Sequence, residues 1–262
     1  MSAHLVLFED RHWRELRPLT DTLPVAALAF GASCLGERLR HATGLPLVSI
    51  EARADALAAW AAAPSPAAKP AAQSDEILAL NSAALPGPWL AAALETSGPA
   101  LLMSEGRVAG ARLPLEMAAS GLGRGAEFES WLLGLGLPSR PADPRFVRWP
   151  WELMEWNAGA IVEDLGTAPG AIEGEVHASA VLLEPARIRI ARGATVEPLA
   201  VLDARGGPIA IGAGALVRPH TVVGGPCVVG ERTQLLGGYV GRSTFGPECR
   251  IAGEVEECVW QG

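Results

Sequence analysis

The carboxyl-terminal third of the chain carries an aliphatic side chain at every sixth position, and a small side chain follows four residues after most of these. A period of six matches neither the 3.6-residue period of a helix nor the two-residue alternation of a strand. It fits a coil with three flat faces, in which the aliphatic residue points inward and the small residue lies near a corner. The aliphatic positions are Ile190, Val196, Leu202, Ile211, Val217, Val223, Val229 and Leu235, and the small ones are Ala194, Ala200, Ala215, Thr221, Cys227 and Thr233. We therefore predict a parallel β-helix of hexapeptide repeats over residues 166–262.

The repeat leads to two further expectations. Gly212, Gly224 and Gly230 follow aliphatic positions, and we attribute them to tight turns that tolerate a missing Cβ atom. The period slips at Ile188–Ile190, at the insertion Asp203–Pro208 and between Leu235 and Phe245, and we expect loops that leave the coil at these places. No cap is visible in residues 259–262, so either a partner chain covers this edge or the natural protein continues.

Residues 1–165 have a different sequence pattern, in which short apolar runs alternate with stretches of helical periodicity. This alternation predicts an α/β layer with a mostly parallel sheet. The last helix, near residues 150–164, starts with a proline at a position that helices favour and is expected to bridge the two domains. The predicted strands cover residues 4–8, 45–50, 76–80, 100–103 and 107–113, and the other predicted helices cover residues 31–41, 52–63 and 89–95.

The charge balance restricts the partners. The chain has 21 basic and 29 acidic side chains, which give a formal charge of −8. Nucleic acid and anionic membranes attract basic surfaces, so neither is expected to be a partner. No segment is apolar for long enough to cross a bilayer, and we expect a cytoplasmic protein. The four cysteines lack metal-site spacing, so we predict packing roles and no metal site formed by them.

Three stretches of the chain resemble a known family. The segment Leu16-Arg-Pro-Leu-Thr-Asp-Thr-Leu-Pro24 is similar to the signature loop of the sugar-1-phosphate nucleotidyltransferases, which reads G-x-G-T-R-L-x-P-L-T-x-x-x-P-K. Residues 149–153 and 253–262 also resemble segments found in members of this family. Together with the hexads, they resemble the bifunctional UDP-N-acetylglucosamine pyrophosphorylases/glucosamine-1-phosphate acetyltransferases. The resemblance implies an α/β nucleotidyltransferase-like (Rossmann-like) domain, then a left-handed parallel β-helix, and a homotrimer.

The chemistry that the resemblance implies is nucleotidyl transfer with Mg²⁺, in which a sugar phosphate attacks a nucleoside triphosphate and pyrophosphate leaves. A backbone cradle and positioned cations must then surround the phosphates. The chain departs from the pattern here, because the glycines fall on Arg11 and Trp13, the arginine on Glu15 and the lysine on Val25.

The second departure lies at the end of the strand predicted near residue 80. The family's N-G-D motif, whose aspartate holds the metal, falls on Asn81, Ser82 and Ala83, so only the asparagine matches. Asn81 is a candidate sugar contact, with a turn residue at a strand end as the alternative.

Four further residues are candidates for chemistry. Arg11, Arg14 and Arg17 are candidate phosphate-binding residues on a remodelled loop, with solvated surface arginines as the alternative. His220 is a candidate general base for acyl transfer by the β-helix, and the alternative is an outward-pointing surface histidine.

Three functions stay open. The first is a sugar-1-phosphate nucleotidyltransferase that uses a nucleotide and Mg²⁺. The second is a non-catalytic sugar-nucleotide-binding, regulatory or scaffold subunit, which the missing glycines and aspartate favour. The third is a hexapeptide-repeat acyltransferase. A nucleotide or a sugar phosphate is the expected partner, and function depends on the site rather than on the fold.

Overall fold

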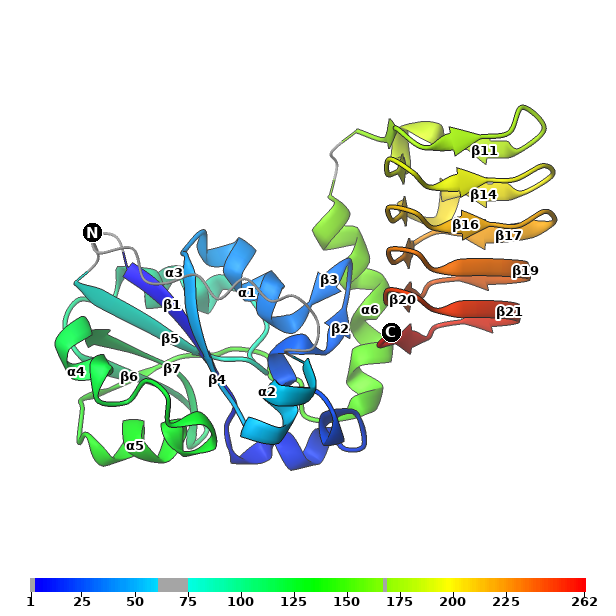
Figure 1. The fold of residues 1–262 in the computed structure, drawn as a ribbon. Helices are drawn as coiled ribbons and strands as arrows, with labels where there is room; N and C mark the ends of the chain where they lie inside the picture. The colour runs from blue at the N-terminus through cyan, green and yellow to red at the C-terminus, as the bar shows by residue number, and fades with distance from the viewer. Residues whose placement is uncertain (1–2, 61–74, 167–168) are drawn as a thin grey trace. The chain divides into compact units, whose positions relative to one another are not determined.

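The computed structural model describes residues 3–60, 75–166 and 169–262. The chain forms two compact units (Figure 1), of which the first contains Met1–Leu28 and Cys34–Pro150 and the second contains Ala29–Ser33 and Trp151–Gly262. Helix α6 (Pro150–Leu165) starts at the last residue of the first unit and continues in the second. The division thus falls at the beginning of this helix, whereas we had expected a domain boundary at its end.

The first unit is built on a six-stranded mixed sheet in the order β4-β1-β5-β7-β6-β8. The pairs β4–β1, β1–β5 and β6–β8 are parallel, and β7 runs antiparallel to both of its neighbours. The strands are β1 (Ala3–Phe8), β4 (Leu47–Glu51), β5 (Glu76–Asn81), β6 (Ala100–Ser104), β7 (Arg107–Pro114) and β8 (Ser139–Pro141). The five predicted strands are confirmed; β8 was not predicted.

Strand β1 lies inside the sheet and is buried on both faces. Leu5 and Leu7 point to one face and Val6 and Phe8 to the other, and none of the four is exposed. A continuous apolar run is typical of such a strand. Phe8 and Val6 pack in one cluster with Phe128 of α5.

All three helices predicted in the first unit are present, but the one predicted over residues 31–41 starts later than expected, because Ser33–Cys34 form the short strand β3. Helix α1 (Leu35–Thr43) ends at Gly44, whose φ of 66° permits the left-handed cap. The predicted helix over 52–63 is α2 (Ala54–Trp60), and residues 61–63 lie outside the described part of the chain. The further helices are α3 (Pro88–Glu95), α4 (Leu115–Ala119) and α5 (Phe128–Gly134). Within the described residues, no helix combines the length and the apolar character that a membrane crossing requires.

The second unit stacks short parallel strands in three ladders, which the chain visits in turn (Figure 1). Every strand pair in these ladders is parallel. One ladder contains β9 (Ala171–Ile172), β12 (Ile188–Ile190), β15 (Ile209–Ile211), β18 (Cys227–Val229), β20 (Thr244–Phe245) and β22 (Val259–Trp260). The second ladder contains β10 (Glu175–Val176), β13 (Thr195–Val196) and β16 (Leu216–Val217). The third contains β11 (Val181–Leu183), β14 (Val201–Asp203) and β17 (Thr221–Gly224). The second and third ladders both continue into β19 (Gln234–Gly241) and β21 (Arg250–Glu256).

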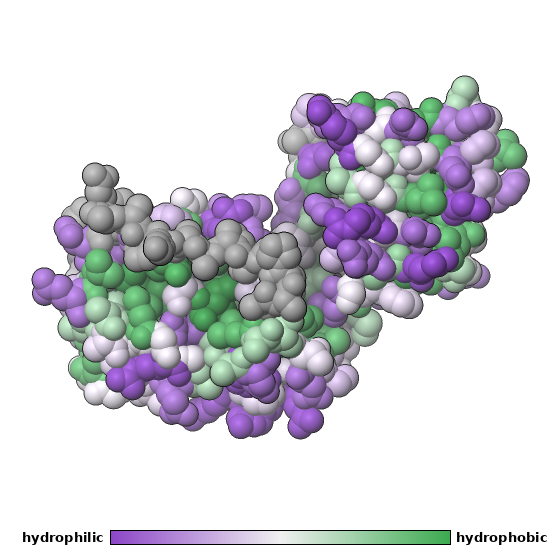
Figure 2. Space-filling view, in the orientation of Figure 1, coloured by the Kyte–Doolittle hydropathy of each residue, from purple (hydrophilic) through white to green (hydrophobic). Residues whose placement is uncertain are grey.

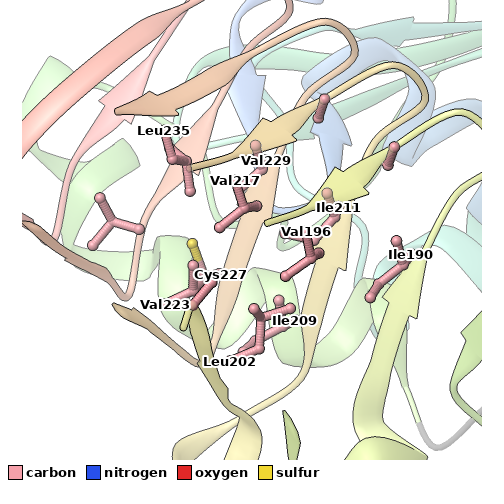
Figure 3. Packing of buried hydrophobic residues seen from close by; sticks show 14 of the residues in the cluster. Ile190, Val196, Leu202, Ile209, Ile211, Val217, Val223, Cys227, Val229 and Leu235 are labelled. Atoms are coloured by element: carbon pink, nitrogen blue, oxygen red, sulfur yellow. The ribbon is translucent and has the colours of Figure 1, made fainter. Parts of the chain in front are cut away.

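The aliphatic residues of the six-residue period form the interior of this stack. All eight predicted inward positions are at most 2% exposed. Figure 3 shows them together with Ile209 and Cys227 between the ladders. Polar residues cover much of the visible face of the unit (Figure 2). The period thus identified the core of the stack correctly.

The corners of the stack explain the small residues. Before every small position except Cys227, which follows Pro226, the preceding residue is in the left-handed region, with φ of 79° at Gly193, 61° at Leu199, 66° at Gly214, 61° at His220 and 55° at Arg232. The small side chain that follows each of these is buried.

Two expectations about the stack need correction. Gly212 and Gly230 do open tight turns, since their carbonyls accept from the amides of Ala215 and Thr233, but neither has a positive φ. A Cβ atom on Gly212 would lie 2.8 Å from the backbone of the next turn, so close approach requires the glycine. Residues 234–241 do not leave the coil as a loop, because β19 spans two ladders, with a register shift between Leu235 and Gly238.

Candidate functional site

A cavity of about 340 Å³ lies in the first unit, where the chain leaves β1. One wall is the 3₁₀ helix η1 (Arg11–Leu16), which contributes Arg11, His12 and Glu15. The turn between β6 and β7 contributes Glu105, the start of β7 contributes Arg107, and Arg148 and Trp149 lie just before α6. The cavity therefore combines three guanidinium groups, two carboxylates and an indole ring.

Asp10 lies behind the lining and holds two of its residues, His12 and Arg107. It follows β1 and caps η1, since its Oδ1 accepts a hydrogen bond of 3.0 Å from the His12 amide. Arg107 donates to both carboxylate oxygens of Asp10, through Nε to Oδ2 and through Nη2 to Oδ1. Asn81 Nδ2 donates to Oδ2 over 2.7 Å. Because β1 and β5 are parallel neighbours with Phe8 opposite Asn81, their carboxyl ends bring these groups together.

The Asp10 cluster is buried and satisfied. Asp10 is 4% exposed, Arg107 8% and Asn81 1%. A buried ion pair is stable only when its remaining donors and acceptors are also engaged. The Asn81 amide meets this condition, since its Nδ2 also donates to the Val108 carbonyl and its Oδ1 accepts from the Ala83 amide.

Glu9 fixes the other side of the same loop. Its Oε1 accepts from the Val25 amide over 2.7 Å, and its Oε2 accepts from Arg53 Nε over 3.2 Å. Arg53 Nη2 in turn donates to the Thr20 and Leu23 carbonyls, and its guanidinium stacks 3.8 Å from the Trp13 ring. Glu9 and Arg53 thus hold the middle of the segment Leu16–Pro24 and the chain at its carboxyl-terminal end.

Side-chain carboxylates occupy the first backbone amides of η1. The Arg11 amide donates to Glu129 Oε2 over 2.9 Å, and the His12 amide donates to Asp10. Burial raises the pKa of the Glu129 carboxyl, and the hydrogen bond from the Arg11 amide opposes this shift. The amides that a phosphate cradle would use are therefore engaged within the chain.

The three arginines of the predicted phosphate cluster have different surroundings. Arg11 lines the cavity. Arg14 is exposed and lies over the Trp13 ring, 4.7 Å from its centroid. Arg17 follows the end of η1 in extended conformation and pairs with Asp21 over 2.6 Å. The structure thus places only Arg11 of the three at the cavity.

The other two predicted residues also have defined places. Asn81 is the turn residue at a strand end that the alternative expected, since it ends β5, its Oδ1 accepts from the Ala83 amide and its carbonyl accepts from the Ala84 amide. It is buried in the Asp10 cluster and does not line the cavity. His220 is exposed at a corner of the stack with φ of 61°, so it points away from the core, as expected for a surface residue. No hydrogen bond joins its ring to another residue in the described part of the chain.

The donor set at the carboxyl ends of β1 and β5 does not suit Mg²⁺, which prefers carboxylate oxygens and water. Asp10 already accepts from four N–H groups, and the buried Ala83 stands where the family resemblance places an aspartate. Among the described residues, no three His, Cys, Asp or Glu side chains are placed together to hold a metal ion.

The sequence reading missed Asp10, Arg107, Glu9 and Arg53. Two adjacent acids directly after a buried strand were the available signal, since ligands of α/β sheets bind outside the carboxyl ends of the strands. Nothing in the local sequence marks Arg107 or Arg53 as their partners.

Comparison with known proteins gives one positive finding. Residues 5–169, well over half of the chain, match the model of a family described as sugar nucleotidyl transferase. The matched range includes every residue of the cavity. A search of curated proteins gives no match.

Proposed function

Because the chain belongs to the sugar nucleotidyl transferase family, we propose that it transfers a nucleotidyl group to a sugar phosphate and binds a phosphorylated sugar in the cavity beside η1. The observation that carries this proposal is the set of guanidinium groups from Arg11, Arg107 and Arg148 around one cavity. Guanidinium groups bind phosphate through paired, charge-assisted hydrogen bonds. A volume of about 340 Å³ is near the lower end of ligand pockets and suits a monosaccharide phosphate.

The remaining lining residues suit the sugar. Glu15 contacts His12 through Oε1 and Glu105 accepts from Arg148 through Oε2, so the second oxygen of each carboxylate can accept a hydrogen bond from a hydroxyl group. Trp149 is 41% exposed, and an indole face packs against the apolar face of a sugar ring. The cavity therefore has complementary groups for both ends of a sugar phosphate.

In the proposed reaction, an oxygen of the sugar phosphate attacks the α-phosphorus of a nucleoside triphosphate. The bond from the α-phosphorus to the bridging oxygen breaks, and pyrophosphate leaves with the electron pair. Arg11 and Arg148 would hold the attacking phosphate and offset its charge, which favours the approach of two anions. Since the described residues do not form a magnesium site, Mg²⁺ enters this proposal only as the counter-ion of the nucleotide.

Non-catalytic binding is the second candidate, and two observations favour it. Ala83 replaces the metal-binding aspartate of the resemblance, and the first amides of η1 are occupied by carboxylates. A regulatory or scaffold subunit needs the cavity but not the transfer chemistry.

Two measurements test the proposal. Isothermal titration with inorganic phosphate, sugar 1-phosphates, nucleoside triphosphates and nucleotide sugars tests binding, and pyrophosphate release from matched pairs of substrates tests transfer. Binding without pyrophosphate release supports the non-catalytic candidate. Absence of heat with all four classes of ligand would refute both candidates.

Variants locate the site. We expect Arg11→Gln and Arg148→Gln each to weaken binding of a sugar 1-phosphate by about tenfold or more, since each removes a charge-assisted hydrogen bond. Arg14→Gln is the matched control, because Arg14 lies on the same 3₁₀ helix but outside the cavity. Equal affinities for all three variants would place the ligand elsewhere.

The features implied by resemblance to the bifunctional enzymes stay predictions. They are the left-handed winding of the stack, the homotrimer and acyl transfer with His220 as base. Sedimentation analysis tests the trimer, and unchanged acyl transfer by a His220→Ala variant would remove the histidine from that role.

A further inference from the structure

The edge of the sheet at which the resemblance expects a divalent cation contains a guanidinium group. Asp10 follows β1 and Asn81 ends β5, and Arg107 pairs with Asp10 and lines the cavity. Arg107 is the first residue of β7, so the backbone of a central strand fixes its position. A permanent organic cation thus pairs with the carboxylate that would otherwise be available to a metal.

Arg107 and a metal ion cannot share Asp10. Its Oδ1 accepts from the His12 amide and from Arg107 Nη2, and its Oδ2 accepts from Asn81 Nδ2 and Arg107 Nε. Both oxygens therefore have two donors each. A cation could bind Asp10 only by displacing Arg107, and that would leave a buried charge without its partner.

The position of Arg107 leaves part of its guanidinium for a ligand. Nε and Nη2 are used by Asp10, and the guanidinium carbon lies 4.0 Å from the centroid of the Phe146 ring, which restricts its orientation. Nη1 has no hydrogen-bond partner among the described residues, and the side chain lines the cavity. An arginine side chain stays protonated at any physiological pH. Its charge is available without the uptake of an ion.

We propose that Arg107 supplies the positive charge that the resemblance assigns to a divalent cation, so that the cavity binds a phosphorylated sugar without a metal. The proposal rests on the proposed function, because it concerns the same ligand and the same cavity. It differs from that function in its consequence: affinity for a sugar phosphate depends on a side chain and not on the concentration of Mg²⁺.

The test compares binding with and without metal. A sugar 1-phosphate such as glucose 1-phosphate or N-acetylglucosamine 1-phosphate is titrated into the full chain by calorimetry, once with excess EDTA and once with millimolar Mg²⁺ at matched ionic strength. We expect the two dissociation constants to agree within twofold. Binding seen only with Mg²⁺ would overturn the inference and leave the proposed function standing. Absence of binding in both buffers would refute the proposed function, and the inference with it.

Two variants separate the charge of Arg107 from its geometry. Arg107→Lys keeps the charge but loses the paired contact with Asp10, and we expect binding in EDTA about tenfold weaker. Arg107→Ala leaves Asp10 open, and we expect binding that is lost in EDTA and partly restored by Mg²⁺, because the carboxylate can then hold a cation.

Circular dichroism of each variant shows whether it is folded. If neither variant folds, the comparison of EDTA with Mg²⁺ in the unmodified chain still decides the question. Binding by a folded Arg107→Ala variant in EDTA that equals the unmodified chain would contradict the inference.

Discussion

Two threonines at equivalent corners of the stack should respond oppositely to the same substitution. Thr221 and Thr233 both follow an inward valine by four residues, and neither is exposed. Thr233 Oγ1 donates to the Gly246 carbonyl over 2.7 Å and accepts from the Cys249 amide over 3.0 Å. Thr221 Oγ1 is buried and has no hydrogen-bond partner among the described residues. Replacement by valine keeps the shape of the side chain and removes only the hydroxyl group.

The magnitudes follow from these contacts. Thr233→Val removes two hydrogen bonds worth about 0.5–1.5 kcal/mol each and leaves a buried carbonyl and a buried amide without partners, so we expect a loss of about 2–4 kcal/mol. Thr221→Val removes a buried hydroxyl group that is not satisfied, and the same reasoning predicts a gain of about 1 kcal/mol. The two variants should therefore differ in sign.

Urea unfolding followed by far-ultraviolet circular dichroism measures the change in the free energy of unfolding. The comparison is valid when the variants and the unmodified chain have the same slope of this free energy against urea concentration. Thr233→Ser is the matched control, because it keeps the hydroxyl group and should retain most of the stability. Hydrogen exchange gives a local readout, since the Cys249 amide should exchange faster in Thr233→Val. Equal losses for the two valine variants would refute this account of the corners.

Three further changes test other parts of the structure. Gly212→Ala should destabilise the stack by about 1–3 kcal/mol in urea unfolding, because its Cβ would press on the next turn, whereas Gly134→Ala in α5 has open space and should gain about 0.5–1 kcal/mol. The raised pKa of the Glu129 carboxyl means that the folded state binds its proton more tightly than the unfolded state does, so ionisation of Glu129 lowers the free energy of unfolding as pH rises from the ordinary carboxyl pKa to the raised one. In that pH window, the stability of Glu129→Gln relative to the unmodified chain should increase with pH. A difference in stability that does not change with pH would contradict this expectation. Burial raises the pKa of Cys227 to about 12, so a thiol reagent at pH 8 should label the partly exposed Cys258 in the native protein and leave Cys227 unlabelled until unfolding, as peptide mass analysis can show.

The stack was predictable because its determinants are local and repeated. Each turn of the stack needs a buried aliphatic side chain such as Val217 at the same place, so the spacing of six is visible in the sequence. The reason for Gly212 was not predictable, because it depends on the backbone of the next turn. The continuous strand β19 was missed since two glycines at positive φ, Gly237 and Gly238, shift the register without ending the strand.

The site was less predictable because its partners are distant in sequence. Arg107 lies 97 residues from Asp10 in the sequence. Glu129 lies 118 residues from Arg11, whose amide donates a hydrogen bond to it. Arg11, Arg14 and Arg17 were grouped because they lie close together in one predicted loop. Their closeness in sequence did not reveal which of these side chains lines a cavity.

The missing glycines of the signature loop have a physical explanation in the contacts of η1. A glycine lets a phosphate approach backbone amides closely, and this need disappears when carboxylates of the chain itself hold those amides, as Asp10 and Glu129 do. Side chains such as Arg11 and Trp13 are then tolerated at the glycine positions. Anion recognition in this chain therefore moves, in our proposal, from backbone amides to guanidinium groups, of which Arg107 is the most rigidly held. It follows that substitution of these arginines should weaken the binding of a phosphorylated sugar, whereas the backbone amides of η1 should contribute little to its affinity.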